Sequence, residues 1–397
     1  MNRQLSIILI GEVDCGKSTL IGRLLFDTRS ISKEAEQELR QAKEPKFAHL
    51  LDSFQEERAN DFTLDTTQAV IRHKKRQYLF IDAPGHKELI KNMLTASSYA
   101  EAAIVVIDAQ KGLEEQTKRH LYILKFIGMD SVMVAINKMD AVCYKEVVFQ
   151  KISREINSFL KQIQLNPISY VPVSAKEGEG LLKRSYKMLW YKAGCLIVSL
   201  DKFIARKQHY EFRFPVQDIY RINNETIIAG TIISGDIKLK DKLKASPFSE
   251  KLTIKGIRSF GKKFKLRAKS PESVGLVLNC AKGLERGYVL YKGAPPRFTK
   301  QFSAKIFCVK PVALKETFTF LCSTQEAKAT ILHINTSMET TNFSVIENSC
   351  GLKITDVAEI TLCLDKPVTT EEFRDLPVLG RFLLLKNSEV HAMGITF

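Results

Sequence analysis

The chain has no apolar run long enough to span a membrane, no paired cysteines and no low-complexity segment. A helical span needs about 20 consecutive apolar residues, and the apolar run near the start, residues 5–10, is only as long as a strand. We therefore expect no membrane anchor, no secretory leader and a cytoplasmic location. The eight cysteines stand singly, with no Cys-x-x-Cys pair and no histidine cluster. This spacing predicts free, mostly buried thiols in a reducing compartment and no structural zinc.

Acidic residues are absent from residues 251–269, in a chain whose net charge is +16. One interpretation is a surface for nucleic acid or an acidic partner. The other is a solvated barrel face, and this is the interpretation that we favour. The basic residues are Lys251, Lys255, Arg258, Lys262, Lys263, Lys265, Arg267 and Lys269, and the expected buried side is Leu252, Ile254, Ile257, Phe264 and Leu266.

At 397 residues the chain is long enough for two or three domains. Up to about residue 205, apolar runs alternate with helical periodicity, which predicts a P-loop-type α/β domain with a mostly parallel sheet and helices on both faces. From residue 212, short β-branched runs between turn signals predict two β-barrels, with a break at Pro295-Pro296. The expected domains are residues 1–205, 206–295 and 296–397, and the expected strands of the first are residues 6–10, 78–82, 102–108, 131–137 and 170–173.

Four short strings follow these strands directly, where open α/β sheets bind ligands. They are Gly11-Glu12-Val13-Asp14-Cys15-Gly16-Lys17-Ser18, Asp82-Ala83-Pro84-Gly85-His86, Asn137-Lys138-Met139-Asp140 and Ser174-Ala175-Lys176. In the first string, Gly11 and Gly16 let backbone N–H groups turn toward phosphate oxygens. Lys17 supplies a cation, and the helix expected at residues 17–26 presents its positive end. We also expect Val13, Asp14, Cys15 and Thr19 to contact the nucleotide.

The other strings predict a Mg²⁺ site and a guanine site. Ser18 and Asp82 are expected to hold Mg²⁺, and Gly85 to donate to the γ-phosphate. A threonine between the first two strings must bind Mg²⁺ and release it after hydrolysis; Thr63 is the candidate, with Thr66 and Thr67 as alternatives. The sequence therefore predicts GTP or GDP with Mg²⁺.

The base is predicted from the last two strings. Asn137 and Asp140 suit guanine, because a carboxylate accepts from the ring N1–H and the 2-amino group, which adenine does not offer. Lys138 is expected to cover the base with its aliphatic stem. The N–H groups of Ser174, Ala175 and Lys176 are expected to close over the guanine oxygen.

These strings, together with Lys91-Asn92-Met93, resemble those of translation-factor-type GTPases related to elongation factor Tu and elongation factor 1-alpha. Within that superfamily, the chain looks like the GTPase subunit of bacterial sulfate adenylyltransferase, in residues 18–28, 108–112, 119–120, 213–217 and 356–359. The resemblance runs end to end and implies a GTPase domain followed by two β-barrels. It also implies that His86 positions the attacking water, with Val13 and Phe62 as an apolar gate around it. The expected catalytic residues are therefore His86, Lys17 and Thr63.

The same resemblance implies a smaller ATP-binding catalytic partner, which makes adenosine 5′-phosphosulfate while GTP hydrolysis drives the reaction. Asp61, Glu12 and Cys15 depart from the common residues of the family, and residues 379–382 read more like elongation factor 1-alpha. The chain stops after the second barrel, so we expect no kinase domain for adenosine phosphosulfate. The alternative is a translation factor that binds tRNA or the ribosome, which the positive charge favours. A GTPase serving another biosynthetic cluster is the third hypothesis.

Overall fold

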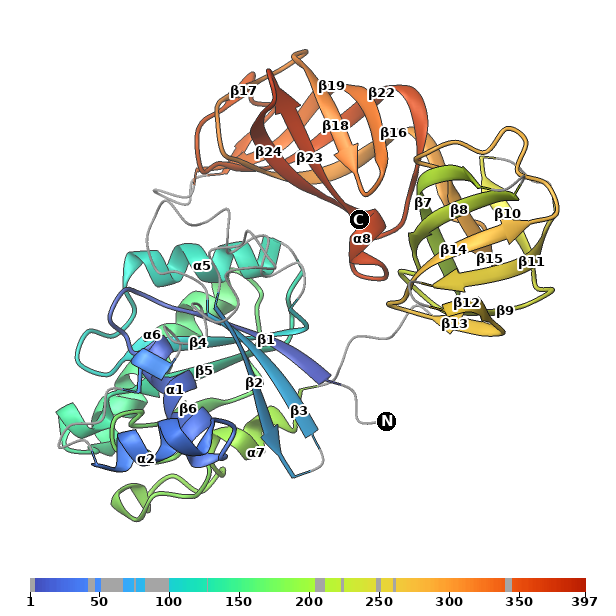
Figure 1. Cartoon of the computed structure of the whole chain (residues 1–397). Coiled ribbons are helices and arrows are strands. Elements are labelled where there is room, and N and C mark those ends of the chain that lie inside the picture. The colour runs from blue at the N-terminus through green and yellow to red at the C-terminus, as the bar shows by residue number, and fades with distance from the viewer. Residues whose placement is uncertain are drawn as a thin grey trace. The chain divides into compact units, whose positions relative to one another are not determined.

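The computed structural model of the chain (Figure 1) describes residues 4–41, 47–50, 67–74, 76–82, 100–126, 128–203, 211–222, 225–247, 251–259, 262–339 and 345–397. The chain divides into two compact units, Met1–Arg206 and Lys207–Phe397. The first unit mixes helices and strands, and the second is built almost wholly from strands.

The first unit contains a six-stranded sheet with the strand order β2-β3-β1-β4-β5-β6. Neighbouring strands run parallel, except that β2 runs antiparallel to β3. The mostly parallel α/β sheet predicted from the apolar pattern is therefore confirmed. Its elements are β1 (Gln4–Ile10), α1 (Lys17–Asp27), α2 (Lys33–Gln41), β2 (Thr67–His73), β3 (Arg76–Asp82), β4 (Ala102–Asp108), α5 (Glu115–Phe126), β5 (Val132–Asn137), α6 (Glu146–Gln162), β6 (Tyr170–Pro172) and α7 (Leu196–Leu200).

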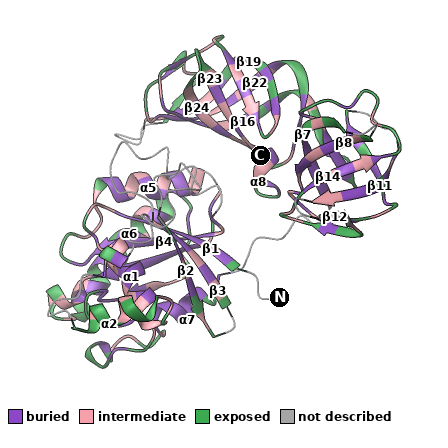
Figure 2. Cartoon of the chain, viewed as in Figure 1, coloured by how far each residue is buried: buried purple, intermediate pink, exposed green. Residues whose placement is uncertain are grey.

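Sequence patterns located the buried strands well and missed the exposed one. Each predicted strand of this sheet agrees with an observed strand to within two residues at either end, and the helix predicted at residues 17–26 is α1. Strand β2 was not predicted. It lies at the sheet edge, and among its residues 68–73 only Ala69 and Ile71 are buried. α2 buries none of its residues (Figure 2).

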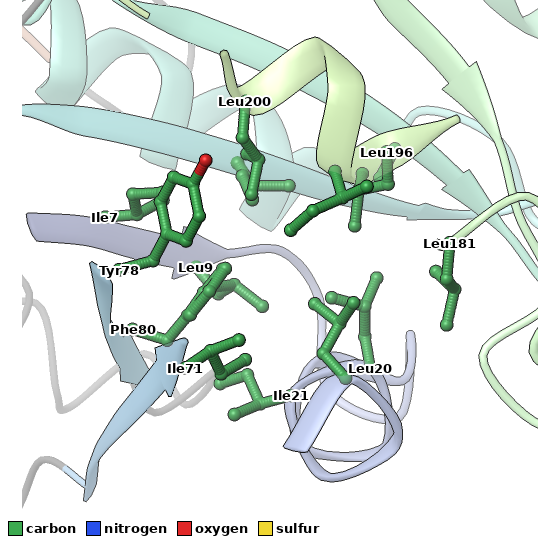
Figure 3. Close-up of a cluster of buried hydrophobic side chains, with 14 of the residues drawn as sticks. Ile7, Leu9, Leu20, Ile21, Ile71, Tyr78, Phe80, Leu181, Leu196 and Leu200 are labelled. Carbon is green, nitrogen blue, oxygen red and sulfur yellow. The ribbon is translucent and has the colours of Figure 1, made fainter. Parts of the chain in front are cut away.

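Strand β1 is buried on both faces, which fixes the point where the following loop begins. On one face Ile7 lies in a buried cluster with Leu20 of α1 and Leu196 of α7 (Figure 3). Ile8 points to the opposite face, because side chains alternate along a strand, and it is also 0% exposed. Burying one such side chain contributes about 1.5–3 kcal/mol, so β1 is held firmly up to Gly11.

The second unit contains two closed six-stranded barrels. The first runs β10-β15-β7-β8-β14-β11 and closes through the β10–β11 pairing; the second runs β18-β23-β24-β16-β22-β19 and closes through β18–β19. The elements of the first barrel are β7 (Phe212–Ile222), β8 (Glu225–Thr231), β9 (Asp236–Lys238), β10 (Lys242–Ser246), β11 (Leu252–Ser259), β12 (Lys262–Lys265), β13 (Arg267–Lys269), β14 (Ser273–Leu278) and β15 (Val289–Lys292). Those of the second are β16 (Arg297–Cys308), β17 (Val312–Ala313), β18 (Thr317–Cys322), β19 (Gln325–Met338), β20 (Val345–Glu347), β21 (Gly351–Leu352), β22 (Val357–Thr370), α8 (Pro377–Gly380), β23 (Arg381–Lys386) and β24 (Glu389–Thr396).

A buried ion pair joins the two barrels within this unit. The Arg213 side chain of β7 is 1% exposed, and its Nε donates to Glu371 Oε1 at 2.8 Å. Beside it, Val289 of β15 packs with Leu376 and Leu379 of the second barrel. A buried charge that loses its partner costs several kcal/mol, so Arg213 and Glu371 hold the two barrels in one arrangement.

The basic stretch of the first barrel differs in one respect from its prediction. Leu252, Ile254 and Ile257 are buried as expected, but Leu266 is 74% exposed. Leu266 lies between β12, which pairs with β11, and β13, which pairs with β9. The chain changes its pairing partner at this residue, and a change of register turns side chains to the other face. The expectation that Leu266 is buried is therefore wrong, and the side chain of Phe264 lies outside the described part of the chain.

The prediction that the cysteines are free is confirmed, but the prediction that most of them are buried is not. All eight are free. Those at positions 15, 195, 308 and 322 are buried, that at 363 is half-buried, and those at 143, 280 and 350 are exposed. Within the described ranges, no group of three or more metal-binding side chains is found, and none of the helices is long and apolar enough to cross a membrane.

Candidate functional site

The loop between β1 and α1 has the backbone geometry of an anion-binding turn. Gly11 and Gly16 have φ angles of 152° and 94°, which glycine tolerates best. A Cβ atom at Gly16 would lie 2.4 Å from Nδ2 of Asn137, so a larger residue does not fit. α1 begins at Lys17 and has no acidic residue in its first turn. Its unpaired N–H groups and positive end therefore suit a phosphate.

The Lys17 ammonium is held inside this loop by backbone oxygens. Its Nζ donates to the carbonyl oxygens of Gly11 at 3.1 Å and Glu12 at 2.9 Å. These oxygens carry no formal charge and do not neutralise the ammonium, which can therefore attract a phosphate. Burial raises the pKa of the neighbouring Cys15 thiol to about 11, so the thiol stays neutral and adds no negative charge there. Of the other predicted contacts in this segment, Val13 and Thr19 are partly buried and Asp14 is exposed.

Ser18 and Asp82 come together as a pair of oxygen groups. Ser18 Oγ donates to Asp82 Oδ2 at 2.7 Å, while Asp82 Oδ1 is buried without a hydrogen-bond partner in the described part of the chain. Burial raises the pKa of Asp82, and the bond from Ser18 and the charge of Lys17 act against that rise. A buried carboxylate oxygen without a donor is costly unless a cation or water meets it. Hard oxygen ligands of this kind fit Mg²⁺, with phosphate oxygens and water completing its coordination.

Asn137 connects the phosphate loop to the last predicted string. It ends β5 and is 2% exposed. Its Nδ2 donates to the carbonyl oxygen of Cys15 at 2.9 Å, and its Oδ1 accepts from the N–H of Ala175 at 2.9 Å. One side-chain amide therefore holds two loops that are far apart in sequence, a role that the motif alone did not reveal.

Asp140 is held at the wall of the pocket by Ser174. Ser174 is 0% exposed, and its Oγ donates to Asp140 Oδ1 at 2.5 Å. The same Oγ accepts from the N–H of Glu177 at 3.2 Å. The carboxylate thus has a fixed orientation, which is what recognition of the N1–H and 2-amino group of guanine requires.

Lys138 is oriented by an acidic residue whose role the motifs did not indicate. Its Nζ lies 2.7 Å from Asp108 Oδ2, and the Asp108 side chain is only 2% exposed. Asp108 Oδ1 accepts from the N–H of Gln110 at 2.8 Å. Asp108 ends β4 at the same sheet edge as the other strings, and an acid at a buried strand end was the signal that could have found it.

A pocket of about 390 Å³ opens beside these groups, with Asn137, Lys138 and Asp140 in its lining. The pocket is large enough for the nucleoside part of a nucleotide. Its predicted lining residues are Gly16, Thr19, Asn137, Lys138, Asp140, Ala175 and Lys176, and three further ones, Phe47, Ala48 and His49, were not predicted. The predictions for Thr63, Gly85 and His86, like those for Asp61 and Phe62, lie outside the described residues.

A second group that sequence reasoning passed over is His120 on α5. It is 2% exposed, and its Nδ1 has no hydrogen-bond partner in the described part of the chain. Burial, together with the charges of Lys17 and Arg119, lowers the pKa of His120 to about 3. The ring therefore stays neutral at physiological pH.

We expect His120 to make this unit sensitive to acid. Between the folded pKa of about 3 and the unfolded value of 6.5, the unfolded chain binds more protons, so stability falls as the pH falls. Between about pH 7.5 and about pH 5 the wild type should lose about 2 kcal/mol more than a His120→Gln variant. Urea unfolding of both proteins, followed by the single tryptophan Trp190, measures this difference in the first unit. Equal losses in the two proteins would contradict it.

Comparison with known proteins agrees with this geometry. Residues 2–211 match the family described as Elongation factor Tu GTP binding domain, and residues 301–396 match the family described as GTP-eEF1A C-terminal domain-like. Elongation factor 1-alpha of Methanocaldococcus jannaschii is 31% identical over 98% of this chain and 96% of its own length. The corresponding protein of Thermoplasma acidophilum is 33% identical over 98% and 96%.

Sulfate adenylyltransferase subunit 1 of Francisella tularensis is 32% identical, over 96% of this chain and 83% of its own length. The solved structure of sup35 complexed with GDP aligns with 100% of this chain at 22% identity, with a TM-score of 0.47, which is too low to carry an argument. Because the first family match covers more than half of the chain and the three relatives cover nearly all of it, the chain belongs to the translation-factor-type GTPases that share the elongation factor Tu GTP-binding domain.

Proposed function

We propose that this GTPase hydrolyses GTP with Mg²⁺ held by Ser18, Thr63 and Asp82. Lys17 binds the outer phosphates, and His86 positions the attacking water. Bound Mg²⁺ would neutralise the charge that develops on the phosphate oxygens. The support is the pairing of Ser18 with a buried, partly unpartnered carboxylate beside the Lys17 loop.

The observation that carries the choice of GTP over ATP is the fixed carboxylate of Asp140 at the pocket wall. We propose that it accepts from guanine, that Lys138 covers the base, and that Gly85 donates to the γ-phosphate. The other nucleotide contacts that we propose are Gly11, Val13, Asp14, Cys15, Gly16, Thr19, Asn137, Ser174, Ala175 and Lys176.

We further propose that hydrolysis drives formation of adenosine 5′-phosphosulfate from ATP and sulfate by a smaller, ATP-binding catalytic subunit. The support is the 32% identity with a sulfate adenylyltransferase subunit 1 and the family-like segments at residues 18–28, 108–112 and 213–217. A cytoplasmic location and domain boundaries near residues 205 and 295 belong to the same proposal.

Coupling of GTP hydrolysis to the partner's reaction requires that the partner distinguish the GTP state from the GDP state. Hydrolysis can drive another reaction only if the partner binds the GTP and GDP states with different affinity. To reverse a two-state equilibrium almost completely, the affinities for the two states must differ by about 10⁴-fold. We propose that the segment around Thr63 and the two barrels are the parts that respond to the bound nucleotide.

A pull-down on the intact protein tests this proposal. The protein is held first with a non-hydrolysable GTP analogue and then with GDP, and the retained molecules are identified. We expect a small ATP-binding adenylyltransferase to be retained in only one nucleotide state. The retained pair should then form adenosine phosphosulfate in a GTP-dependent reaction. Recovery of tRNA or ribosomes would overturn it.

A second candidate function, in translation, is favoured by one basic face of the first barrel. Lys242 and Lys244 alternate with buried residues along β10 and are exposed. On either side of Thr253 in the paired strand β11, Lys255 and Lys251, which directly precedes β11, are exposed. Thr253 lies directly opposite Lys242, so both of these lysines are diagonal neighbours of Lys242.

These four lysines make no ion pair within the described ranges. Like charges gathered on one exposed face give that face a positive potential, which attracts an anion. Lysine is depleted from protein–protein interfaces but binds phosphate well as a point charge. The face therefore suits an RNA backbone, and the second candidate is an elongation-factor-like GTPase that binds tRNA or the ribosome.

Salt dependence separates the two candidates. If RNA binding uses this face, the logarithm of the affinity should fall linearly with the logarithm of the salt concentration. The slope should be about −0.7 to −0.9 for each phosphate contact. Binding of a catalytic protein subunit through a packed interface should depend less on salt. A flat salt response with tRNA would remove the translation candidate.

A further inference from the structure

One wall of the nucleotide pocket comes from a segment that lies outside the four motifs. Residues 47–49 line the pocket together with the guanine residues. Phe47 is 4% exposed, and its ring centroid lies 5.4 Å from that of Phe26 in an edge-on arrangement. A Cβ atom at Gly22 of α1 would lie 1.9 Å from the carbonyl oxygen of Phe47. Glycine at position 22 therefore lets this segment lie directly against α1.

Arg23 connects the same segment to the guanine side of the pocket. Its guanidinium carbon lies 4.9 Å from the centroid of the Phe47 ring. Its Nε donates to Asp27 Oδ1 at 2.9 Å, and its Nη1 donates to the carbonyl oxygen of Lys176 at 2.9 Å. A Cβ atom at Gly178 would lie 2.2 Å from Arg23 Nη2, so the loop after Lys176 closes tightly around the guanidinium.

The position of this wall points to the ribose. In the proposed site the phosphates belong to the loop that ends at Gly16 and the base belongs to Asp140 and Lys176, and all three residues line the pocket. The ribose joins those two parts of the ligand, so the remaining wall lies beside it. His49 is exposed at this wall and has ring nitrogens that can pair with ribose hydroxyls.

We propose that residues 47–49 form the ribose-facing wall of the guanine-nucleotide pocket, and that Arg23 is a positioning residue that holds this wall to the Lys176 loop. The inference rests on the proposed function only in that the pocket binds a guanine nucleotide. The partner that GTP hydrolysis serves does not enter it.

Replacing Arg23 by Ala tests the positioning role. The Lys176 loop is expected to close over the guanine 6-oxygen, so Arg23→Ala should weaken binding of both GTP and GDP by about tenfold or more, the usual effect of losing a charge-assisted hydrogen bond. 2-Aminopurine riboside triphosphate lacks the 6-oxygen but keeps the ribose, so Arg23→Ala should weaken its binding less than it weakens binding of GTP. The analogue also lacks the N1–H of guanine, which lowers its affinity for the wild type and the variant alike. A general loss of stability would weaken both ligands equally.

Arg40→Ala is the matched control. Arg40 makes the same kinds of contact on α2, an ion pair with Glu36 at 2.7 Å and a position 5.3 Å from the Phe26 ring centroid. It does not line the pocket. Its replacement should leave nucleotide affinity unchanged.

His49→Ala tests the wall itself with an exposed side chain whose loss should not unfold the protein. GTP binding is expected to weaken by about tenfold, and the difference between variant and wild type should shrink when 2′-deoxy- or 3′-deoxy-GTP is the ligand, as a double-mutant cycle requires. Isothermal titration of both proteins measures this.

Wild-type protein that binds no GTP would refute the guanine site, whereas normal GTP binding by both Arg23→Ala and His49→Ala would overturn the proposed wall.

Discussion

Asp140→Asn is expected to move the base preference from guanosine to xanthosine nucleotides. In the proposed site the carboxylate accepts from the N1–H and the 2-amino group of guanine, whereas an amide in its place would donate to the 2-oxygen of xanthine. A site built for one set of hydrogen bonds rejects the wrong partner strongly, so GTP affinity should fall by about 10³-fold or more. Ser174 can still donate to the amide oxygen, so the local structure should persist.

Direct calorimetric titration of the wild type and the variant with GDP and with XDP measures this switch. Glu177→Gln is the control, because the backbone of Glu177 bonds to the same Ser174 while its side chain pairs with Lys187 outside the pocket lining. This control should keep wild-type preference. Unchanged GTP affinity in Asp140→Asn would refute the guanine assignment.

His86→Ala is expected to slow GTP hydrolysis by about 10²–10⁴-fold, the usual contribution of a positioned catalytic group. Nucleotide affinity should stay the same, because the proposed role of His86 is to orient water and not to bind the base or phosphates. Single-turnover hydrolysis with protein in excess separates the chemical step from nucleotide release.

His73→Ala provides a comparison within the same unit, since His73 ends β2 and is not among the predicted site residues. Its hydrolysis rate should match that of the wild type. A parallel loss of GTP binding and hydrolysis in His86→Ala would instead show that His86 maintains the structure of the site.

Local sequence predicted the parts of the site that depend on backbone conformation and chemical type. The positive φ angles at Gly11 and Gly16, the start of α1 at Lys17 and the strands that precede each motif all follow from neighbouring residues. The same local rules failed at Leu266, where the strand changes its pairing partner and a non-local choice decides which face is buried.

The sequence by itself therefore determined the GTPase family, the change from an α/β fold to β-barrels, and the residue types that can meet a guanine nucleotide. Only the tertiary structure decided that Asn137 bonds to both Cys15 and Ala175, and that Arg23 reaches across to Lys176. Those partners are more than 30 positions apart in the chain. Their contact depends on the order of the parallel strands and on the packing of α1 against the sheet, which no local pattern specifies.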